Sequence, residues 1–187
     1  IPVHFSGLPC DMLKIFQLSK KYNFRIIEDA SHAIGSQYNY LKKKKDLFTK
    51  VGSCKHSDIT VFSFHPVKII TTGEGGAICT KNPELAEKVK NLRSHGIVKD
   101  AKLFKNKFYG PWSYEQQTLG FNYRMNDIQA ALGISQINRL DQIISERNRL
   151  LNSYKNKLSQ LPLYFLNIPK DVLSSVHLCV ICLDKCT

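Results

Sequence analysis

The chain has 187 residues, of which 43% are hydrophobic and 22% are charged, a composition typical of a soluble globular protein. No stretch approaches the roughly 18 consecutive apolar residues of a membrane-spanning helix, so such a helix is excluded, and the length allows one domain with a sizeable core. Lys and Arg number 27 and Asp and Glu 15, and the resulting net charge of +12 would attract polyanions.

The positive charge leaves a nucleic-acid-binding module open as one function. The charge is spread along the chain apart from the run Lys42–Lys45, which is typical of a solvated loop tip. No recognised nucleic-acid motif accompanies this run. Smaller phosphate-bearing ligands would suit the same charge.

The cysteines and the first residues indicate the cellular compartment of the protein and whether the chain is a fragment. The chain starts at Ile1 inside an apparent strand, without Met or a basic leader, which we interpret as a fragment of a longer cytoplasmic protein with reduced thiols. Cys179 and Cys182, with Cys186 and His177 nearby, have zinc-like spacing. Their segment is typical of a strand, in which positions three apart face opposite sides, so we expect no metal site.

The first elements in chain order form a βαβ unit. The sequence predicts a strand over Ile1–Phe5, a helix from an Asp11 cap to about Tyr22, and a strand over Phe24–Ile27. Two strands joined by a helix are expected to be parallel. Asp29 then stands just beyond the second strand.

A second group of strands follows. Ala30–Ser36 is predicted to form a helical turn, and the polar, lysine-rich segment Gln37–Gly52 an exposed excursion. Ile59–Phe64 predicts a buried strand that His65–Pro66 ends. Ala77–Thr80 predicts a further strand, which should be antiparallel because the connection is too short for a parallel crossover.

Lys68 stands among apolar residues just beyond that buried strand. Desolvation there would lower the pKa of its ammonium group and free the amine to attack a carbonyl carbon. A lysine that only extends its charge to solvent remains the alternative. Ligands of open α/β sheets bind at the carboxyl ends of strands, so Asp29 and Ser63 are expected at one rim of the sheet.

The remaining elements are mainly helical. We expect a helix from the Asn82 cap to His95–Gly96, a long loop over 97–119, a helix from the Asn126 cap to Ile137, a helix from Leu140 to Leu161, and a strand over 176–183.

Four segments carry a family resemblance: Val3–Asp11, Glu28–Ala33, Ser63–Gly76 and Gly120–Met125. They resemble, in order, segments of the DegT/DnrJ/EryC1/StrS family of sugar aminotransferases, which use pyridoxal phosphate (PLP). The resemblance implies an α/β fold, namely part of the large domain of a fold-type I PLP-dependent transferase. Its mostly parallel sheet would carry an antiparallel strand and helices on both faces, and its N- and C-terminal portions would be missing. Residues 1–140 would form the partial PLP-binding domain, and 141–187 a connecting helix and the start of a small domain.

The resemblance also implies roles for individual residues. Lys68 would be the catalytic lysine that forms the cofactor imine, and Asp29 would be the partner of the pyridine nitrogen. His32 would lie near the cofactor ring, and Ser63 would bind its phosphate. Asn122 would bind the phosphate of the neighbouring subunit's cofactor, and Arg124 is a candidate for binding the carboxylate of glutamate. Two alternatives stay open, a salt bridge between Arg124 and Asp127 and a purely structural hydrogen bond of His32. Lysine rather than histidine at position 68 favours amination over the 3-dehydration that some relatives perform.

Two segments, Pro66–Gly76 and Gly110–Gln117, are most similar to members on the route to pseudaminic acid. This similarity implies transfer of an amino group from L-glutamate to C4 of a UDP-linked 4-keto-6-deoxy-N-acetyl-hexose. It also implies a homodimer with shared sites and no nucleic-acid or membrane partner. A non-catalytic fragment of the same fold remains an alternative.

Overall fold

The computed structural model describes residues 1–39 and 48–184. Its contacts divide the chain into two compact units, which we call the large unit (Ile1–Thr80 with Asp127–Thr187) and the small unit (Lys81–Asn126). The family resemblance implies a different division, into a partial PLP-binding domain (1–140) and the start of a further domain (141–187), and that boundary stays a prediction. None of the helices in the described part has the length and apolar character to cross a membrane.

The first helix of the large unit, α1 (Met12–Tyr22), matches its prediction. The Asp11 carboxylate accepts the backbone N–H of Lys14 at 3.1 Å, and the helix ends at Asn23 in the left-handed region. The strand predicted over Ile1–Phe5 is wrong. Only Val3 forms a bridge, to Asp29, and η1 (Phe5–Gly7) follows as a 3-10 turn because Ser6 and Gly7 adopt positive φ.

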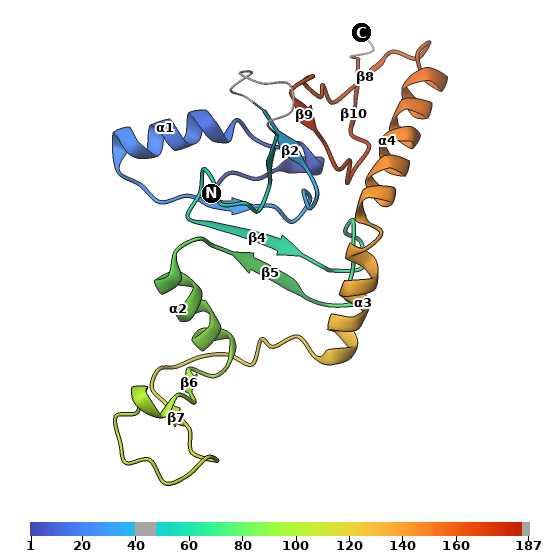
Figure 1. Cartoon of the computed structure of the whole chain (residues 1–187). Helices are drawn as coiled ribbons and strands as arrows, with labels where there is room; N and C mark the ends of the chain where they lie inside the picture. The colour runs from blue at the N-terminus through green and yellow to red at the C-terminus, as the bar shows by residue number, and fades with distance from the viewer. Residues whose placement is uncertain (40–47, 185–187) are drawn as a thin grey trace. The chain divides into compact units, whose positions relative to one another are not determined.

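The main sheet has the strand order β1-β4-β5 (Figure 1). Its strands are β1 (Ile27–Asp29), β4 (Ile59–Ser63) and β5 (Gly76–Cys79). β1 pairs with β4 in parallel and β5 pairs with β4 antiparallel, which confirms both predicted directions. The first strand begins later than the predicted Phe24, because the Asp58 carboxylate accepts the backbone N–H of Ile26 at 2.8 Å.

The parallel register sorts side chains onto the two faces of this sheet. Asp29 pairs with Val61, and Ser63 lies two residues further along β4 on the same face, about 7 Å away along the strand. The opposite face carries the buried Phe62. Phe62 belongs to the core, whose buried members include Met12, Ile26, Ala30, Ala33, Tyr38, Val51 and Val172.

That opposite face also holds a buried carboxylate. Glu28 is 2% exposed, and it accepts hydrogen bonds from Nε2 of His4 at 2.8 Å, from the Thr60 hydroxyl at 2.9 Å and from the Ser57 hydroxyl. Burial opposes ionisation of Glu28, but these bonds outweigh it and lower the pKa of the carboxyl. The network ties the N-terminal segment to the sheet.

A small antiparallel sheet, β3-β2-β9, changes the interpretation of residues 37–52. Its strands are β3 (Thr49–Lys50), β2 (Gln37–Tyr38) and β9 (Val172–Leu173). Tyr38 and Val51 are only 3% and 7% exposed, so the prediction of an exposed excursion is wrong at both of its ends. The sequence missed this because β9, which pairs with β2, lies over a hundred residues away in the chain. The predicted solvated run Lys42–Lys45 lies outside the described residues.

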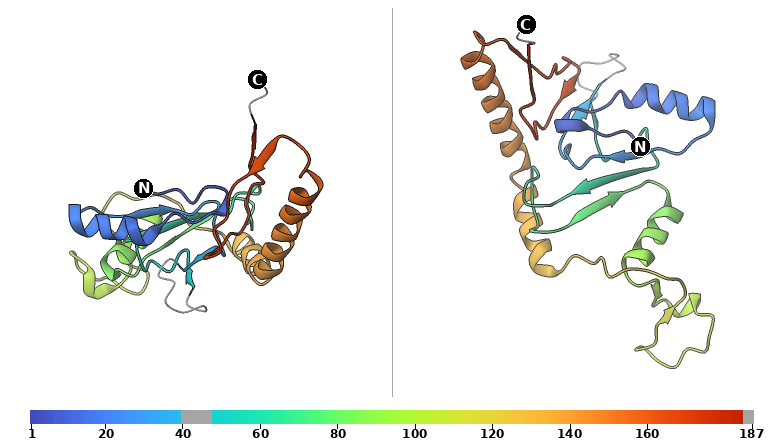
Figure 2. Two further views of the ribbon diagram at one scale, coloured as in Figure 1. Left: turned by 90° about the horizontal axis from the view of Figure 1, so that it is seen from above. Right: turned by 180° about the vertical axis from the view of Figure 1, so that it is seen from behind.

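The last part of the large unit contains α3 (Asp127–Ile137), α4 (Leu140–Lys157) and the pair β8 (Leu163–Phe165) and β10 (Ile181–Leu183). α3 and α4 follow each other with a bend, and β8 and β10 lie beside α4 (Figure 2). Ile144 and Leu151 are the buried residues of α4, which confirms its predicted apolar stripe in part. The strand predicted over 176–183 forms only at Ile181–Leu183, because Val176 has a positive φ of 50°.

The small unit is built on α2 (Pro83–Arg93). The Asn82 side chain accepts the N–H groups of Glu84 and Leu85 at 2.9 and 3.1 Å, as the predicted cap requires. The predicted loop over 97–119 contains three short elements: β6 (Ile97–Val98), η2 (Ala101–Leu103) and β7 (Glu115–Gln116). β6 and β7 pair antiparallel.

Candidate active site

Lys68 lies in the loop that leaves the carboxyl end of β4. Its backbone N–H donates to the carbonyl of His65 at 2.9 Å, and Phe64 joins the two ends of the loop through bonds to Thr72 and Gly75. The Lys68 side chain is half-buried, between the exposed Val67 and the buried Ile69, so the full desolvation expected from its apolar neighbours is not reached. The loop therefore presents the amine at the rim of the sheet.

Asp29 lies at the carboxyl end of β1. Burial opposes ionisation of its carboxyl, but a hydrogen bond from the N–H of Ser31 at 3.0 Å and the charges of His32 and Lys68 lower the pKa. The carboxylate is thus held ionised within electrostatic range of the Lys68 ammonium. Of the residues predicted at this rim, Asp29 and Lys68 are thus within electrostatic range of each other.

His32 lies in the turn after β1, where the predicted helical turn 30–36 forms successive tight turns instead. Its Nδ1 accepts the backbone N–H of Ser6 at 3.3 Å, so the proton of the neutral ring is assigned to Nε2. Burial and the charge of Lys68 lower the pKa of His32, while Asp29 opposes this shift. The ring is therefore fixed by a structural hydrogen bond and also lies within range of Lys68.

His177 is a further residue of this site, and its presence here was not expected. Its ring centre lies 4.4 Å from that of His32. The residue is 9% exposed, and its Nδ1 is the one buried side-chain N or O atom among the described residues without a hydrogen-bond partner. Burial, followed by the charges of His32, Lys68 and Arg147, lowers the pKa of His177 to about 4. A buried, unpaired, neutral nitrogen beside these groups is suited to bind a ligand.

Backbone hydrogen bonds hold His177 in place. Its N–H donates to the carbonyl of Ser6 at 2.9 Å, and Nη1 of Arg147 donates to its carbonyl at 3.3 Å. Gly7 has a φ of 87°, and a Cβ there would lie 2.7 Å from Oγ of Ser175, so only glycine allows this close approach. The N-terminal segment and the segment after β9 thus form one wall of the site.

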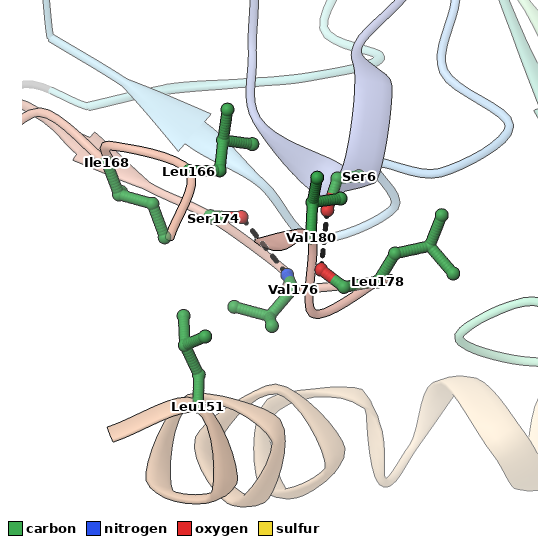
Figure 3. Close-up of a pocket in the computed structure, with 8 residues that line it drawn as sticks. All are labelled: Ser6, Leu151, Leu166, Ile168, Ser174, Val176, Leu178 and Val180. Carbon is green, nitrogen blue, oxygen red and sulfur yellow. Dashed lines mark hydrogen bonds between the residues drawn. The ribbon is translucent and has the colours of Figure 1, made fainter. Parts of the chain in front are cut away.

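A small cavity adjoins this wall, lined by Ser6, Leu151, Leu166, Ile168, Ser174, Val176, Leu178 and Val180 (Figure 3). Its volume of about 10 Å³ is that of roughly one water molecule. Ser6 Oγ donates to the carbonyl of Leu178 at 2.6 Å across its edge. The cavity is too small for a cofactor or a sugar, so the open rim near Lys68 is the candidate site.

The other two predicted site residues belong to the small unit. Asn122 forms an isolated bridge with Ser94, and both Asn122 and Arg124 are exposed. Arg124 lines a surface cleft of the small unit. In the described part of the chain, no group of three or more His, Cys, Asp or Glu residues could hold a metal ion, and Cys186 lies outside that part.

The sequence profile of the DegT/DnrJ/EryC1/StrS aminotransferase family matches residues 1–187. The chain belongs to this family. A UDP-4-amino-4,6-dideoxy-N-acetyl-beta-L-altrosamine transaminase of Campylobacter jejuni is 43% identical over 166 residues, which are 89% of this chain and 39% of that protein. The family resemblance noted in the sequence is thereby confirmed.

Solved structures described as aminotransferases show the same fold. Helicobacter pylori PseC, an aminotransferase involved in the biosynthesis of pseudoaminic acid, matches with a TM-score of 0.78 and 33% identity over 98% of this chain and 44% of that one. Spr1654 of Streptococcus pneumoniae in its PLP form matches with a TM-score of 0.78 and 28% identity over 97% of this chain and 47% of that one. The chain has the fold of part of a fold-type I transferase and spans less than half the length of these relatives.

The titration of His177 tests whether its ring is buried and neutral in this chain. Because burial and nearby charges lower its folded pKa to about 4, the unfolded chain binds more protons than the folded chain between pH 4 and the ordinary value of 6.5. We expect its imidazole NMR signals to titrate with a midpoint near pH 4. The free energy of unfolding should fall as the pH is lowered through this window, and less so in the His177→Phe variant. A midpoint near 6.5 would contradict the buried, neutral ring.

Proposed function

We propose that the chain is the lysine-bearing part of a PLP-dependent nucleotide-sugar aminotransferase. In this proposal it transfers an amino group from L-glutamate to C4 of a UDP-linked 4-keto-6-deoxy-N-acetyl-hexose, on the route to pseudaminic acid. The single observation that carries the proposal is that the charge of Lys68 acts on both Asp29 and His32 at the carboxyl ends of parallel strands. The names of the C. jejuni and H. pylori relatives support the choice of substrate and pathway.

The residues at the rim fit the parts of PLP. Asp29 offers an ionised carboxylate for the pyridine nitrogen, Ser63 a hydroxyl for the phosphate, and Lys68 an amine for the aldehyde. The unpaired Nδ1 of His177 is a further group that needs a partner. PLP, when bound, would supply an electrophilic carbon and a ring that accepts electrons.

The chain's own residues then have distinct roles in the proposal. Nζ of Lys68 would hold the cofactor through its aldehyde, and as a free amine it would accept a proton and donate it to C4 of the sugar. The Asp29 carboxylate keeps a proton on the ring nitrogen. His32 and His177 stay neutral, and so provide hydrogen bonds without a charge that would oppose the protonated ring.

The partner residues of the proposal lie in the small unit. Asn122 would bind the phosphate of the cofactor in a second subunit, and Arg124 the carboxylate of glutamate, in a homodimer with shared sites. Both side chains are exposed within their unit, as residues that serve another subunit or a substrate must be. A nucleic-acid-binding module is the weaker alternative, since no recognised nucleic-acid motif accompanies the positive charge of the chain.

The proposal predicts that Asp29→Asn slows amino transfer. The substitution is made in the longest polypeptide containing residues 1–187 that can be expressed. The amide cannot hold a proton on the ring nitrogen, so transfer from L-glutamate should slow by about 100-fold or more, as for the loss of an acid–base group. Formation of 2-oxoglutarate with the UDP-linked keto sugar as acceptor would measure it. Asp184→Asn, at an exposed position, is the matched control. Equal rates for Asp29→Asn and the unaltered protein would refute the role of Asp29.

A further inference from the structure

The segment 174–177, which we call the histidine segment, has an unusual backbone conformation. It follows β9, forms neither helix nor strand, and ends with His177. Val176 within it has a φ of 50°, in the left-handed region. A β-branched residue is strained in this region, so the conformation persists only where the surrounding structure enforces it. Strained residues of this kind gather at active sites, and Val176 directly precedes a residue of the candidate site.

The N-terminal part of the large unit binds one side of the histidine segment. Oγ of Ser36 accepts the backbone N–H of Ser175 at 3.0 Å, and the carbonyl of Ser6 accepts that of His177 at 2.9 Å. The Ser175 hydroxyl donates to the carbonyl of His32 at 3.2 Å. These bonds attach the N–H groups of the segment to the turns that hold His32.

Helix α4 binds the other side of the histidine segment. Nη1 of Arg147 donates to the carbonyls of Val176 and His177, at 3.3 Å each. Nδ2 of Asn148 donates to the carbonyl of Ser174 at 3.0 Å. Because the guanidinium group carries several donors in a fixed plane, one arginine can bind two successive carbonyls. Two adjacent side chains of α4 thus bind the carbonyls on either side of the strained residue and its own carbonyl.

Helix α4 also encloses the side chain of Val176. This side chain is 6% exposed, and it lines the cavity of about 10 Å³ together with Leu151 of α4 (Figure 3). A change of φ at Val176 to the extended region would rotate the chain that follows. The ring of His177 would then leave its place 4.4 Å from the ring of His32. The strained φ is therefore a condition for the contact between the two rings.

We propose that Arg147 and Asn148 of α4 are positioning residues, which hold the strained conformation of Val176 and thereby keep the ring of His177 against that of His32. This inference rests on the proposed function, in which His177 is a neutral group of the PLP site. It adds α4 to the elements that shape this site. All of these residues belong to the large unit.

The contact between the two imidazole rings makes the proposal measurable by NMR. The full chain without PLP should show a nuclear Overhauser effect between ring protons of His32 and His177, because the ring centres lie 4.4 Å apart. Arg147→Leu should lose this signal while its amide spectrum stays that of a folded chain. Arg149→Leu is the matched control, since Arg149 is exposed on the same helix and pairs with Glu146. It should keep the signal.

The titration of His177 gives a second readout. The charges of His32, Lys68 and Arg147 act on its ring, and burial has the largest effect on its pKa. In Arg147→Leu the ring loses burial, so its midpoint should rise from near pH 4 toward the ordinary value of 6.5. Lys68→Ala removes a charge without releasing the ring. It should raise the midpoint less and keep the signal between the rings. A purely stabilising role of Arg147 would leave both readouts unchanged in the folded chain.

Asn148→Ala is a milder variant that decides the question if Arg147→Leu does not fold. It removes the bond to the carbonyl of Ser174 and should weaken the signal between the rings. An undiminished signal in every folded variant of Arg147 and Asn148 would overturn the inference. An equal loss of the signal in Arg149→Leu would also overturn it, because the effect would then not depend on the bonds to the histidine segment.

Mapping of the PLP adduct separates this inference from the proposed function, since the NMR measurements need no PLP. A chain that forms no adduct on Lys68, but loses the signal between the rings in Arg147→Leu, would refute only the proposed function. A chain that forms the adduct, but keeps that signal in Arg147→Leu, would refute only the inference about α4.

Discussion

Replacement of Lys68 by alanine should abolish covalent binding of PLP and reduce amino transfer by at least about 1000-fold. The structure gives the reason, because Lys68 is the half-buried amine that acts electrostatically on Asp29 and His32 at the sheet rim. We expect the absorbance band of the bound cofactor to be missing in this variant. Lys81→Ala, at an exposed position of the small unit, should behave like the unaltered protein.

A second substitution separates the charge of Lys68 from its nucleophilicity. Lys68→Arg keeps a cation near Asp29, so the pKa of that carboxyl should stay low, but guanidinium does not form the covalent bond. Its activity should therefore fall as far as that of the alanine variant. Activity within tenfold of the unaltered protein would show that Lys68 acts only through its charge.

The second large effect concerns stability. Glu28→Ala should lower the free energy of unfolding by about 3–5 kcal/mol, because it leaves the buried partners His4 and Thr60 without their acceptor. Glu28→Gln keeps the volume and should cost less. Urea denaturation of the PLP-free chain would measure both variants. Glu146→Gln removes an exposed carboxylate paired with Arg149 and should cost less than about 1 kcal/mol.

The pH dependence of this effect follows from the lowered pKa of Glu28. Because the folded pKa lies below the ordinary value of 4.5, the stabilisation is fully present above that value and is lost as the pH falls through the folded pKa. The unaltered chain and Glu28→Gln should therefore converge in stability at acid pH. At neutral pH, a free energy of unfolding for Glu28→Ala within about 0.5 kcal/mol of that of the unaltered chain would contradict the account of this network, because such a small difference is typical of surface substitutions.

Local signals predicted much of the fold. α1 and α2 follow from the caps Asp11 and Asn82, whose side chains bind the first free N–H groups as expected. The directions of β4 and β5 follow from the length of the turn between them. Elements that depend on distant partners were missed. β2 forms because β9 pairs with it, and no local pattern indicates that pairing.

The candidate site shows the same division. The ends of parallel strands predicted that Asp29 and Ser63 share a rim, and the register of β1 and β4 confirms that they share a face. His177 was missed because its segment was interpreted as a strand. The positive φ of Val176 and the bond to Ser6 instead turn it toward His32. In the sequence, a single histidine near two cysteines did not indicate that His177 lies in the candidate site.

Mapping of a reduced PLP adduct tests the central proposal most directly. The longest expressed polypeptide that contains residues 1–187 would be incubated with PLP, treated with borohydride, digested and analysed by mass spectrometry. The account predicts one modified peptide, with the label on Lys68, and no labelled peptide in Lys68→Ala. A label on another lysine, or one spread over the exposed lysines with Lys68 unmodified, would contradict it.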